Sequence, residues 1–170
     1  MTPKLLATLR IRKAGIDDAA AIARLGTELN EHEGDPVENF TEGAVRRDGF
    51  GEEPQYEVYL AELDGAPVAY ALFYDTYETG YAAPGLYLCD LHVTAAARRQ
   101  GVARALVAAV ARTARLRGKS FLWWTSRARN RGAQAFYRSL GAIEEPVVAH
   151  ALTDEAFAAM AREGAVPDDA

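Results

Sequence analysis

Alternating apolar and polar positions predict the strands in the first half of the chain. Residues 9–14, “LRIRKA”, alternate in this way, and the stretch 55–63, “QYEVYLAEL”, is rich in β-forming residues. Asp64 and Gly65 follow as a dipeptide typical of a tight hairpin, and “APVAYALFYDTY” returns as the partner strand. Apolar residues at helical spacing predict helices over 18–30 and 41–47.

The second half of the chain alternates strands with helices. “GLYLCDLHV” (85–93) is apolar enough for a central strand. From Gly101, apolar residues share one helical face: Val102, Leu106, Ala109, Val110, Thr113 and Leu116. The pattern then predicts, in order, a strand over 120–126, a helix over 131–140, a strand over 146–152 and a helix over 153–160. The element order β-α-α-β-β-β-α-β-α-β predicts one α/β domain over residues 1–170 with a mixed sheet.

Charge is distributed unevenly along the chain. Residues 91–143 contain ten Arg, one Lys and no Asp or Glu, a charge of +11 against −16 for the remainder, within a net charge of −5. A basic segment in an acidic protein indicates one surface for an anion and another for a cation or for solvent. A helix with a solvated arginine face would give the same charge. Nucleic acid is disfavoured as a partner, because the acidic remainder would repel phosphates.

Composition narrows the class of protein further. With 49% apolar and 25% charged residues, the chain has a globular composition. No apolar run approaches the ~20 residues of a membrane helix. The start, “MTPKLLATLRIRKA”, lacks the apolar core of a signal peptide, so we expect no membrane partner and a cytoplasmic location. One Cys and three scattered His predict neither a disulfide nor a metal site.

The segment between the apolar strand and the long helix has the residues of an anion-binding loop. In “RRQGVA” (98–103), Gly101 removes a side chain where the backbone approaches a ligand, and the first helical amides lack partners. These amides, the helix dipole and the guanidinium groups of Arg98 and Arg99 suit phosphate oxygens. The segment has neither a P-loop lysine nor the GxGxxG pattern, and a plain strand-to-helix turn would also use such a glycine.

Two motifs resemble those of the GNAT acetyltransferase superfamily. “RRQGVA” is similar to its acetyl-CoA motif, Q/R-x-x-G-x-G/A, and “RNRGAQAFYRSLGA” (129–142) is similar to its second hallmark. The matching positions are Arg98, Gly101 and Ala103 in the first motif and Asn130, Ala133, Tyr137 and Gly141 in the second. The resemblance implies an α/β (α+β) GNAT-type domain, with a mixed, mostly antiparallel sheet of six or seven strands flanked by helices.

Stretches outside these motifs resemble the spermidine/spermine N-acetyltransferases and the related diamine and thialysine acetyltransferases. “DGFGEEP” is the most specific of them, and “YALFYDTYET” and “LYLCDLHV” add to it. That subgroup has a Glu-Asp pair before the CoA loop, whereas this chain has Cys89 and Asp90. The subgroup's aromatic residue after the “TY-acid” stretch is also missing, since Gly80 stands near that position.

The resemblance implies acetyl-CoA as co-substrate, no metal, and direct attack of an amine on the thioester. It places the pyrophosphate against residues 98–103 and the pantetheine along the strand that ends at Val93. Tyr137 is then the acid that protonates the leaving thiolate, although an aromatic residue packed on the core is the alternative. The residues implied to bind acetyl-CoA are Leu91, His92, Val93, Arg98, Arg99, Gly101, Val102, Ala103, Arg104, Asn130, Ala133 and Tyr137.

Strand residues near the CoA loop bear on deprotonation of the amine. Asp90 would accept the proton, directly or through water. Strand alternation predicts that Cys89 and Asp90 face opposite sides of the sheet. If Cys89 faces the cleft, a water chain to Asp90, Glu28 or Glu78 is needed. His92 shares the face of Asp90 and could relay a proton, whereas Cys89 lacks the basic neighbours that activate a nucleophile.

Acidic residues indicate how the substrate is held. Glu28, Glu33 and Glu78 stand where the polyamine subgroup has acids, and with Cys89 and Asp90 they form the predicted substrate site. We therefore expect acetyl-CoA-dependent N-acetylation of a primary amine on a polyamine or diamine-like small molecule, by a homodimer. Amino acids, aminoglycosides and protein amino termini are alternative acceptors. A non-catalytic acetyl-CoA-binding sensor is the alternative outside the enzymes.

Overall fold

The chain divides into two compact units. A computed structural model describes residues 8–164, so expectations for the first seven residues fall outside it. The units are Met1–Arg129 and Asn130–Ala170. Within the described residues, the first unit holds a sheet and three α-helices, and the second holds two further α-helices.

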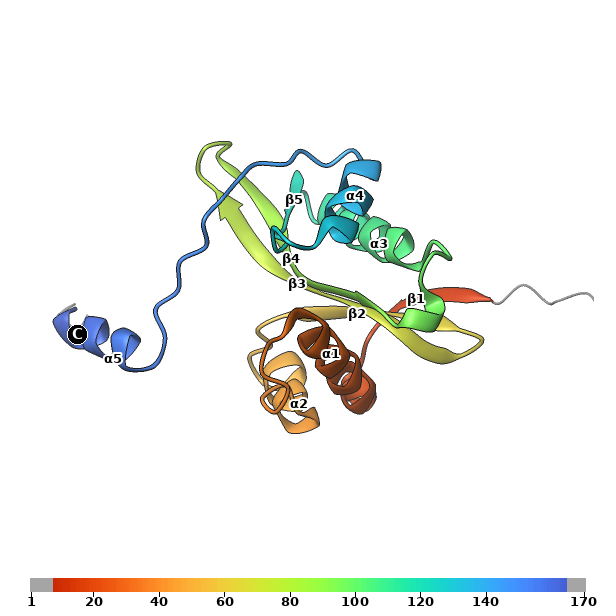
Figure 1. Cartoon of the computed structure of the whole chain (residues 1–170), viewed down its shortest axis with the longest axis horizontal. Helices are drawn as coiled ribbons and strands as arrows, with labels where there is room; N and C mark the ends of the chain where they lie inside the picture. The colour runs from red at the N-terminus through yellow and green to blue at the C-terminus, as the bar shows by residue number, and fades with distance from the viewer. Residues whose placement is uncertain (1–7, 165–170) are drawn as a thin grey trace, which may run out of the picture. The chain divides into compact units, whose positions relative to one another are not determined.

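A five-stranded sheet in the order β1-β2-β3-β4-β5 forms the frame of the first unit (Figure 1). Its strands are β1 (Leu9–Lys13), β2 (Glu57–Leu63), β3 (Ala66–Glu78), β4 (Ala83–Val93) and β5 (Phe121–Trp123). Neighbouring strands are antiparallel, except for the parallel pair β4 and β5. The mixed sheet is confirmed, although the described residues contain five strands rather than six or seven.

The hairpin predicted between β2 and β3 is present. Asp64 and Gly65 have φ values of 51° and 84°, the left-handed backbone that a two-residue turn between twisted strands requires. Beyond the last β2 pair, between Glu57 and Phe73, β3 continues to pair with β4 as far as Glu78. The long β3–β4 hairpin therefore extends beyond the end of β2, as Figure 1 shows.

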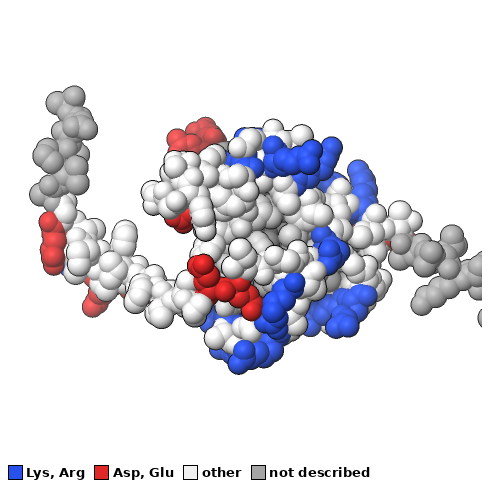
Figure 2. Space-filling view, turned by 90° about the horizontal axis from the view of Figure 1, so that it is seen from above, with Lys and Arg blue, Asp and Glu red and all other residues white. Residues whose placement is uncertain are grey.

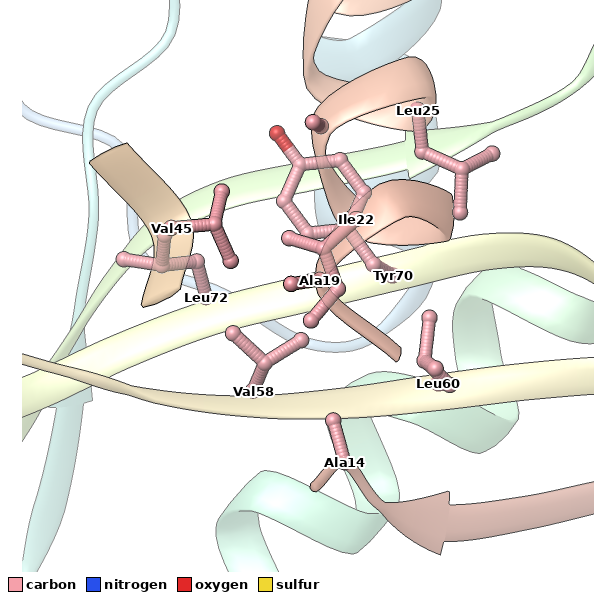
Figure 3. Close-up of a cluster of buried hydrophobic side chains, with 10 residues drawn as sticks. Ala14, Ala19, Ile22, Leu25, Val45, Val58, Leu60, Tyr70 and Leu72 are labelled. Carbon is pink, nitrogen blue, oxygen red and sulfur yellow. The ribbon is translucent and has the colours of Figure 1, made fainter. Parts of the chain in front are cut away.

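Helices α1 (Ala19–Glu33) and α2 (Glu42–Phe50) cover one face of the sheet (Figure 1). Ile22 and Leu25 of α1 and Val45 of α2 are fully buried. They pack with Tyr70 of β3 and with neighbouring apolar residues of β2 in the cluster that Figure 3 shows. Because burial of such side chains contributes about 1.5–3 kcal/mol each, this cluster fixes α1 against the strands that carry the candidate site.

Helix α3 (Val102–Leu116) covers the opposite face of the sheet (Figure 1). Val102, Leu106 and Val110 are buried as predicted. Leu116, predicted on the same face, is 71% exposed. Leu116 is the last residue of α3, so the predicted stripe continues too far toward the end of the helix.

The second unit contains α4 (Arg131–Ser139) and α5 (Asp154–Glu163). The helices predicted over 131–140 and 153–160 are therefore confirmed. The strand predicted over 146–152 is wrong, because that stretch has no regular secondary structure. Pro146 has no N–H to donate to a sheet, and Val148 is 79% exposed.

Positive charge in the basic segment lies partly on an exposed helix face. Arg104, Arg112 and Arg115 of α3 are exposed, and Figure 2 shows the Lys and Arg side chains in several groups separated by uncharged surface. Part of the segment is thus the solvated arginine face considered above. Within residues 8–164, no helix combines the length and apolar character needed to cross a membrane.

Candidate active site

A β-bulge in β4 determines where the two candidate strand residues point. Leu72 of β3 pairs with Asp90, whereas the next residue, Phe73, pairs with Leu88, so Cys89 is an extra residue in β4. Residues directly opposite in a sheet share a face, so Asp90 lies on the face of Leu72, which packs against α1 and α2. Alternation from Leu88 places Cys89 on this same face. The prediction that Cys89 and Asp90 face opposite sides is wrong, because it assumed an unbulged strand.

Asp90 is a half-buried carboxyl group held by a buried phenol. The Tyr70 hydroxyl donates a hydrogen bond to Asp90 Oδ2 at 2.8 Å. Burial raises the pKa of Asp90, and the hydrogen bonds of Tyr70 and Cys89 and the charge of His92 oppose that rise. A carboxyl group with a raised pKa is better matched to accepting a proton near neutral pH than one in water.

Cys89 stays protonated in this environment. Cys89 is exposed at the surface, and the partial burial of its thiol and the neighbouring Asp90 carboxyl raise the pKa of the thiol to about 12. A thiol is a poor nucleophile compared with the thiolate. That Cys89 forms no covalent intermediate stays a prediction from the sequence.

His92 is linked to Glu28 across the interface between β4 and α1. His92 Nε2 lies 3.2 Å from Glu28 Oε2, and Arg24 donates to Glu28 Oε1 at 2.6 Å. The His92 side chain is 5% exposed, and burial lowers its pKa, with Arg98 and His32 acting in the same direction while Glu28 opposes it. Glu28 therefore contacts both Arg24 and His92.

Glu33 and Glu78, two further acids predicted at the substrate site, have partners elsewhere in the first unit. Glu33 Oε2 lies 2.9 Å from Arg127 Nε, which belongs to the segment after β5. Glu78 lies near the tip of the β3–β4 hairpin and accepts from the backbone N–H of Gly80. It is six residues beyond Leu72, roughly 20 Å along the strand. The first unit therefore does not bring Glu78 to Asp90.

Several tyrosine side chains lie on the same face of the sheet as Asp90, and none of them was predicted to belong to the site. The rings of Tyr74 and Tyr87 are 5.2 Å apart, and the Tyr87 hydroxyl lies 3.2 Å from Thr125 Oγ1. Burial and the charges of Asp48 and Asp90 raise the pKa of Tyr56 to about 12. The spacing of Tyr70, Leu72 and Tyr74 in β3 already indicates that these side chains share one face of the sheet. That Asp90 lies on the same face follows only from the register of β4 against β3.

A pocket of about 320 Å³ opens beside this group of tyrosines. Tyr56 and Tyr74 line it, together with the charged residues Glu57, Asp75 and Arg117. Asp90 is not among the residues that line this pocket. The Tyr56 hydroxyl is buried and has no hydrogen-bond partner among residues 8–164.

The segment before α3 has the backbone of an anion-binding loop. Gly101 has a φ of 81°, the left-handed region that favours glycine, and it is the N-cap of α3. Ala105 donates the first intrahelical hydrogen bond, to the Gly101 carbonyl. The N–H groups of Val102, Ala103 and Arg104 therefore precede the first intrahelical bond. Arg99 is exposed, as an anion site at this helix end requires.

The edge of β4 next to this loop is open. Parallel pairing with β5 ends at Tyr87 and Trp123, because β5 is shorter than the predicted 120–126. From Leu88 to Val93, β4 has no β5 partner within the described residues. Leu91 and Val93 thus present backbone groups along this edge, although Arg98 Nε already donates to the Val93 carbonyl at 3.1 Å.

The second hallmark motif lies in the other unit. Asn130 Oδ1 accepts a hydrogen bond from the backbone N–H of Ala133 at 3.0 Å, so Asn130 caps α4 as the sequence allowed. Tyr137 is on α4, and its ring lies 5.3 Å from that of Phe136. No group of metal-ligating side chains occurs among the residues that the structure describes.

Solved structures share this fold. An integron cassette protein from the V. cholerae mobile metagenome superposes with a TM-score of 0.78 at 20% identity, covering 91% of this chain and 98% of that one. The aminoglycoside N-acetyltransferase AAC(6′)-Iy in complex with CoA gives 0.73 at 21% identity, with coverages of 89% and 98%. At these identities the likeness is one of fold.

Sequence similarity extends to the family. Residues 24–142 match the acetyltransferase (GNAT) family, and the chain belongs to that family. Thialysine N-epsilon-acetyltransferases from Bos taurus and Mus musculus are 36% and 34% identical to it, over 81% of this chain and 85% of each relative. The chain is therefore an acyltransferase enzyme of the acetyltransferase class.

Proposed function

We propose that this chain transfers the acetyl group of acetyl-CoA directly to a primary amine of a small molecule, with Asp90 as the base. The observation that carries the proposal is the half-buried Asp90 carboxyl in the stretch of β4 whose edge has no β5 partner among the described residues. A carboxylate there can take a proton from an ammonium group while the strand edge is free to bind an extended ligand.

The residues near the start of α3 fit the anionic half of acetyl-CoA. The free amides of Val102 and Ala103, the left-handed Gly101 and the exposed Arg99 offer donors and positive charge to a pyrophosphate. Leu91 and Val93 would pair with the pantetheine arm along the open strand edge. When bound, acetyl-CoA supplies an activated thioester carbonyl for the amine to attack.

Proton transfers are assigned to two side chains. Asp90 accepts the ammonium proton, which frees the nitrogen lone pair for attack. Tyr137, assigned by its motif, donates a proton to the leaving thiolate. Cys89 stays a neutral thiol at the substrate side, because its pKa is raised to about 12. The amine and thioester then react without an enzyme nucleophile.

Charge around the site favours a particular class of amine. Glu28 is paired with Arg24 and Glu33 with Arg127, so neither acid is reserved for a second substrate ammonium. The charged residues that line the pocket are also paired, Glu57 with Arg117 and Asp75 with Lys119. We therefore favour thialysine or a similar diamino acid over a polyamine, and the names of the relatives support this choice.

Steady-state kinetics on an amine panel test the proposal. Thialysine, lysine, putrescine, spermidine, an aminoglycoside and a peptide amino terminus would be compared by CoA-thiol release. We expect the highest kcat/KM for thialysine, and Asp90→Asn should lower kcat by at least about tenfold. Preference for spermidine would overturn the substrate assignment. Tight acetyl-CoA binding without turnover on any amine would point instead to a sensor.

A further inference from the structure

Tyr70 stands out in the core that supports α1. It is fully buried in β3, among side chains that are otherwise apolar, such as Ile22, Leu25 and Val45 (Figure 3). A buried phenol needs a hydrogen-bond partner for its O–H, because an unpaired polar group is costly there. The Asp90 carboxyl is that partner, at 2.8 Å.

The register of β4 against β3 creates this contact. Tyr70 pairs directly with His92, and Leu72 pairs with Asp90, so Tyr70 and Asp90 are diagonal neighbours on one sheet face. The bulge accommodates the extra residue Cys89, while Leu88 still pairs with Phe73 and Asp90 with Leu72. The hydroxyl of Tyr70 therefore reaches Asp90 across the sheet face that both side chains share.

We propose that Tyr70 is a positioning residue for Asp90: its hydroxyl holds Oδ2 in a fixed orientation and keeps the carboxyl group ionised, so that Oδ1 faces the incoming ammonium group. This inference rests on the proposed role of Asp90 as base. A hydrogen bond donated to a carboxylate favours its charged form, and burial opposes that form. Tyr70 thus offsets part of the cost of placing a base in a half-buried position.

Other titratable groups near Asp90 act on the same equilibrium. Cys89 lies beside it in the bulge and His92 two residues later in β4, and the charge of Asp90 also acts on Tyr74 of β3 and on Tyr56, which precedes β2. Glu28 of α1 is bonded to His92, and Arg98 and His32 also act on that ring. None of these groups is changed by removing the Tyr70 hydroxyl, so its contribution can be isolated.

Tyr70→Phe tests the inference, with Tyr59→Phe as the matched control. Tyr59 lies in β2, and its hydroxyl is hydrogen-bonded to Thr113 Oγ1 at 2.8 Å on the α3 face. The pKa of Asp90 would be read from the NMR titration of its carboxyl carbon, with Asp90→Asn identifying the signal. We expect Tyr70→Phe to raise that pKa by about one unit, since a hydrogen bond to a charged group has roughly that strength.

The acidic limb of the kcat/KM profile should move to higher pH with the titration. An Asp90 titration that is the same in wild type, Tyr70→Phe and Tyr59→Phe overturns the positioning role. Because the titration needs no turnover, it stands apart from the proposed function, which fails separately if Asp90→Asn leaves kcat unchanged. If Tyr70→Phe does not fold, 3-fluorotyrosine at position 70 gives a stronger donor and should lower the Asp90 pKa; an unchanged pKa contradicts the inference.

Discussion

Placing a carboxylate at the start of α3 should specifically weaken acetyl-CoA binding. A Cβ at Gly101 meets no atom within 4 Å, so an Asp side chain has room there. Its φ of 81° strains any side chain, although Asp adopts this region more readily than most residues. Two unit charges ~6 Å apart at an effective dielectric constant of ~40 repel by about 1.4 kcal/mol. That repulsion corresponds to about a tenfold rise in Kd.

Gly118→Asp is the matched control for this change. Gly118 follows α3, has a φ of 71°, and also has open space around a Cβ. The helix lies between the two positions, which are therefore roughly 25 Å apart, at 1.5 Å per residue. This separation exceeds the Debye length of ~8 Å at physiological salt, so a charge at position 118 should not reach the pyrophosphate.

Isothermal titration calorimetry with acetyl-CoA at low and high salt gives both affinities. We expect Gly101→Asp to bind about tenfold more weakly at low salt, with a smaller difference at high salt. Gly118→Asp should bind as wild type does, and thermal unfolding without ligand shows whether both variants are folded. Equal affinities for the two variants would refute the assignment of the anion site to the start of α3.

Three further changes test separate parts of the structure. Tyr137→Phe should lower kcat by about ten- to a thousandfold while acetyl-CoA affinity stays the same, as loss of a general acid requires; an unchanged kcat removes Tyr137 from the mechanism. Arg117 and Lys13 lower the pKa of Glu57 to about 2, so its stabilisation is present above the unfolded-state pKa of ~4.3 and is lost as the pH falls toward 2. Glu57→Gln should therefore lower the free energy of unfolding by about 1 kcal/mol at pH 7 and by little at pH 2, whereas an equal loss at both pH values would contradict the ion pair. Iodoacetamide should alkylate Cys89 at pH 8 about a hundredfold more slowly than free cysteine, because its pKa is raised to about 12; a rate like that of free cysteine would exclude the proposed environment.

Features encoded by neighbouring residues were predictable from the sequence. The turn at Asp64 and Gly65 follows from the local preference of that dipeptide. Gly101 precedes α3 with a positive φ, which glycine adopts readily. Asn130 as the cap of α4 is also local, since its partner is only three residues away. Such contacts need no knowledge of the tertiary structure.

Features that depend on pairing between distant segments were not predictable. The bulge at Cys89 follows from the register of β4 against β3, and it reversed the predicted orientation of one of two adjacent side chains. Glu33 was interpreted as an acid for substrate, but its partner Arg127 comes from a segment 94 residues later in the sequence. The strand over 146–152 was favoured by its apolar residues alone. The homodimer, the cytoplasmic location and the absence of a nucleic-acid partner stay predictions from sequence.

Product analysis by mass spectrometry tests the central claim most directly. Wild type and Asp90→Asn would each be incubated with acetyl-CoA and thialysine, and acetylated thialysine would be quantified alongside released CoA. The account predicts equimolar acetylated amine and CoA with the wild type and a loss of at least about tenfold with Asp90→Asn. Equal product from both proteins, or CoA release without an acetylated amine, would contradict it.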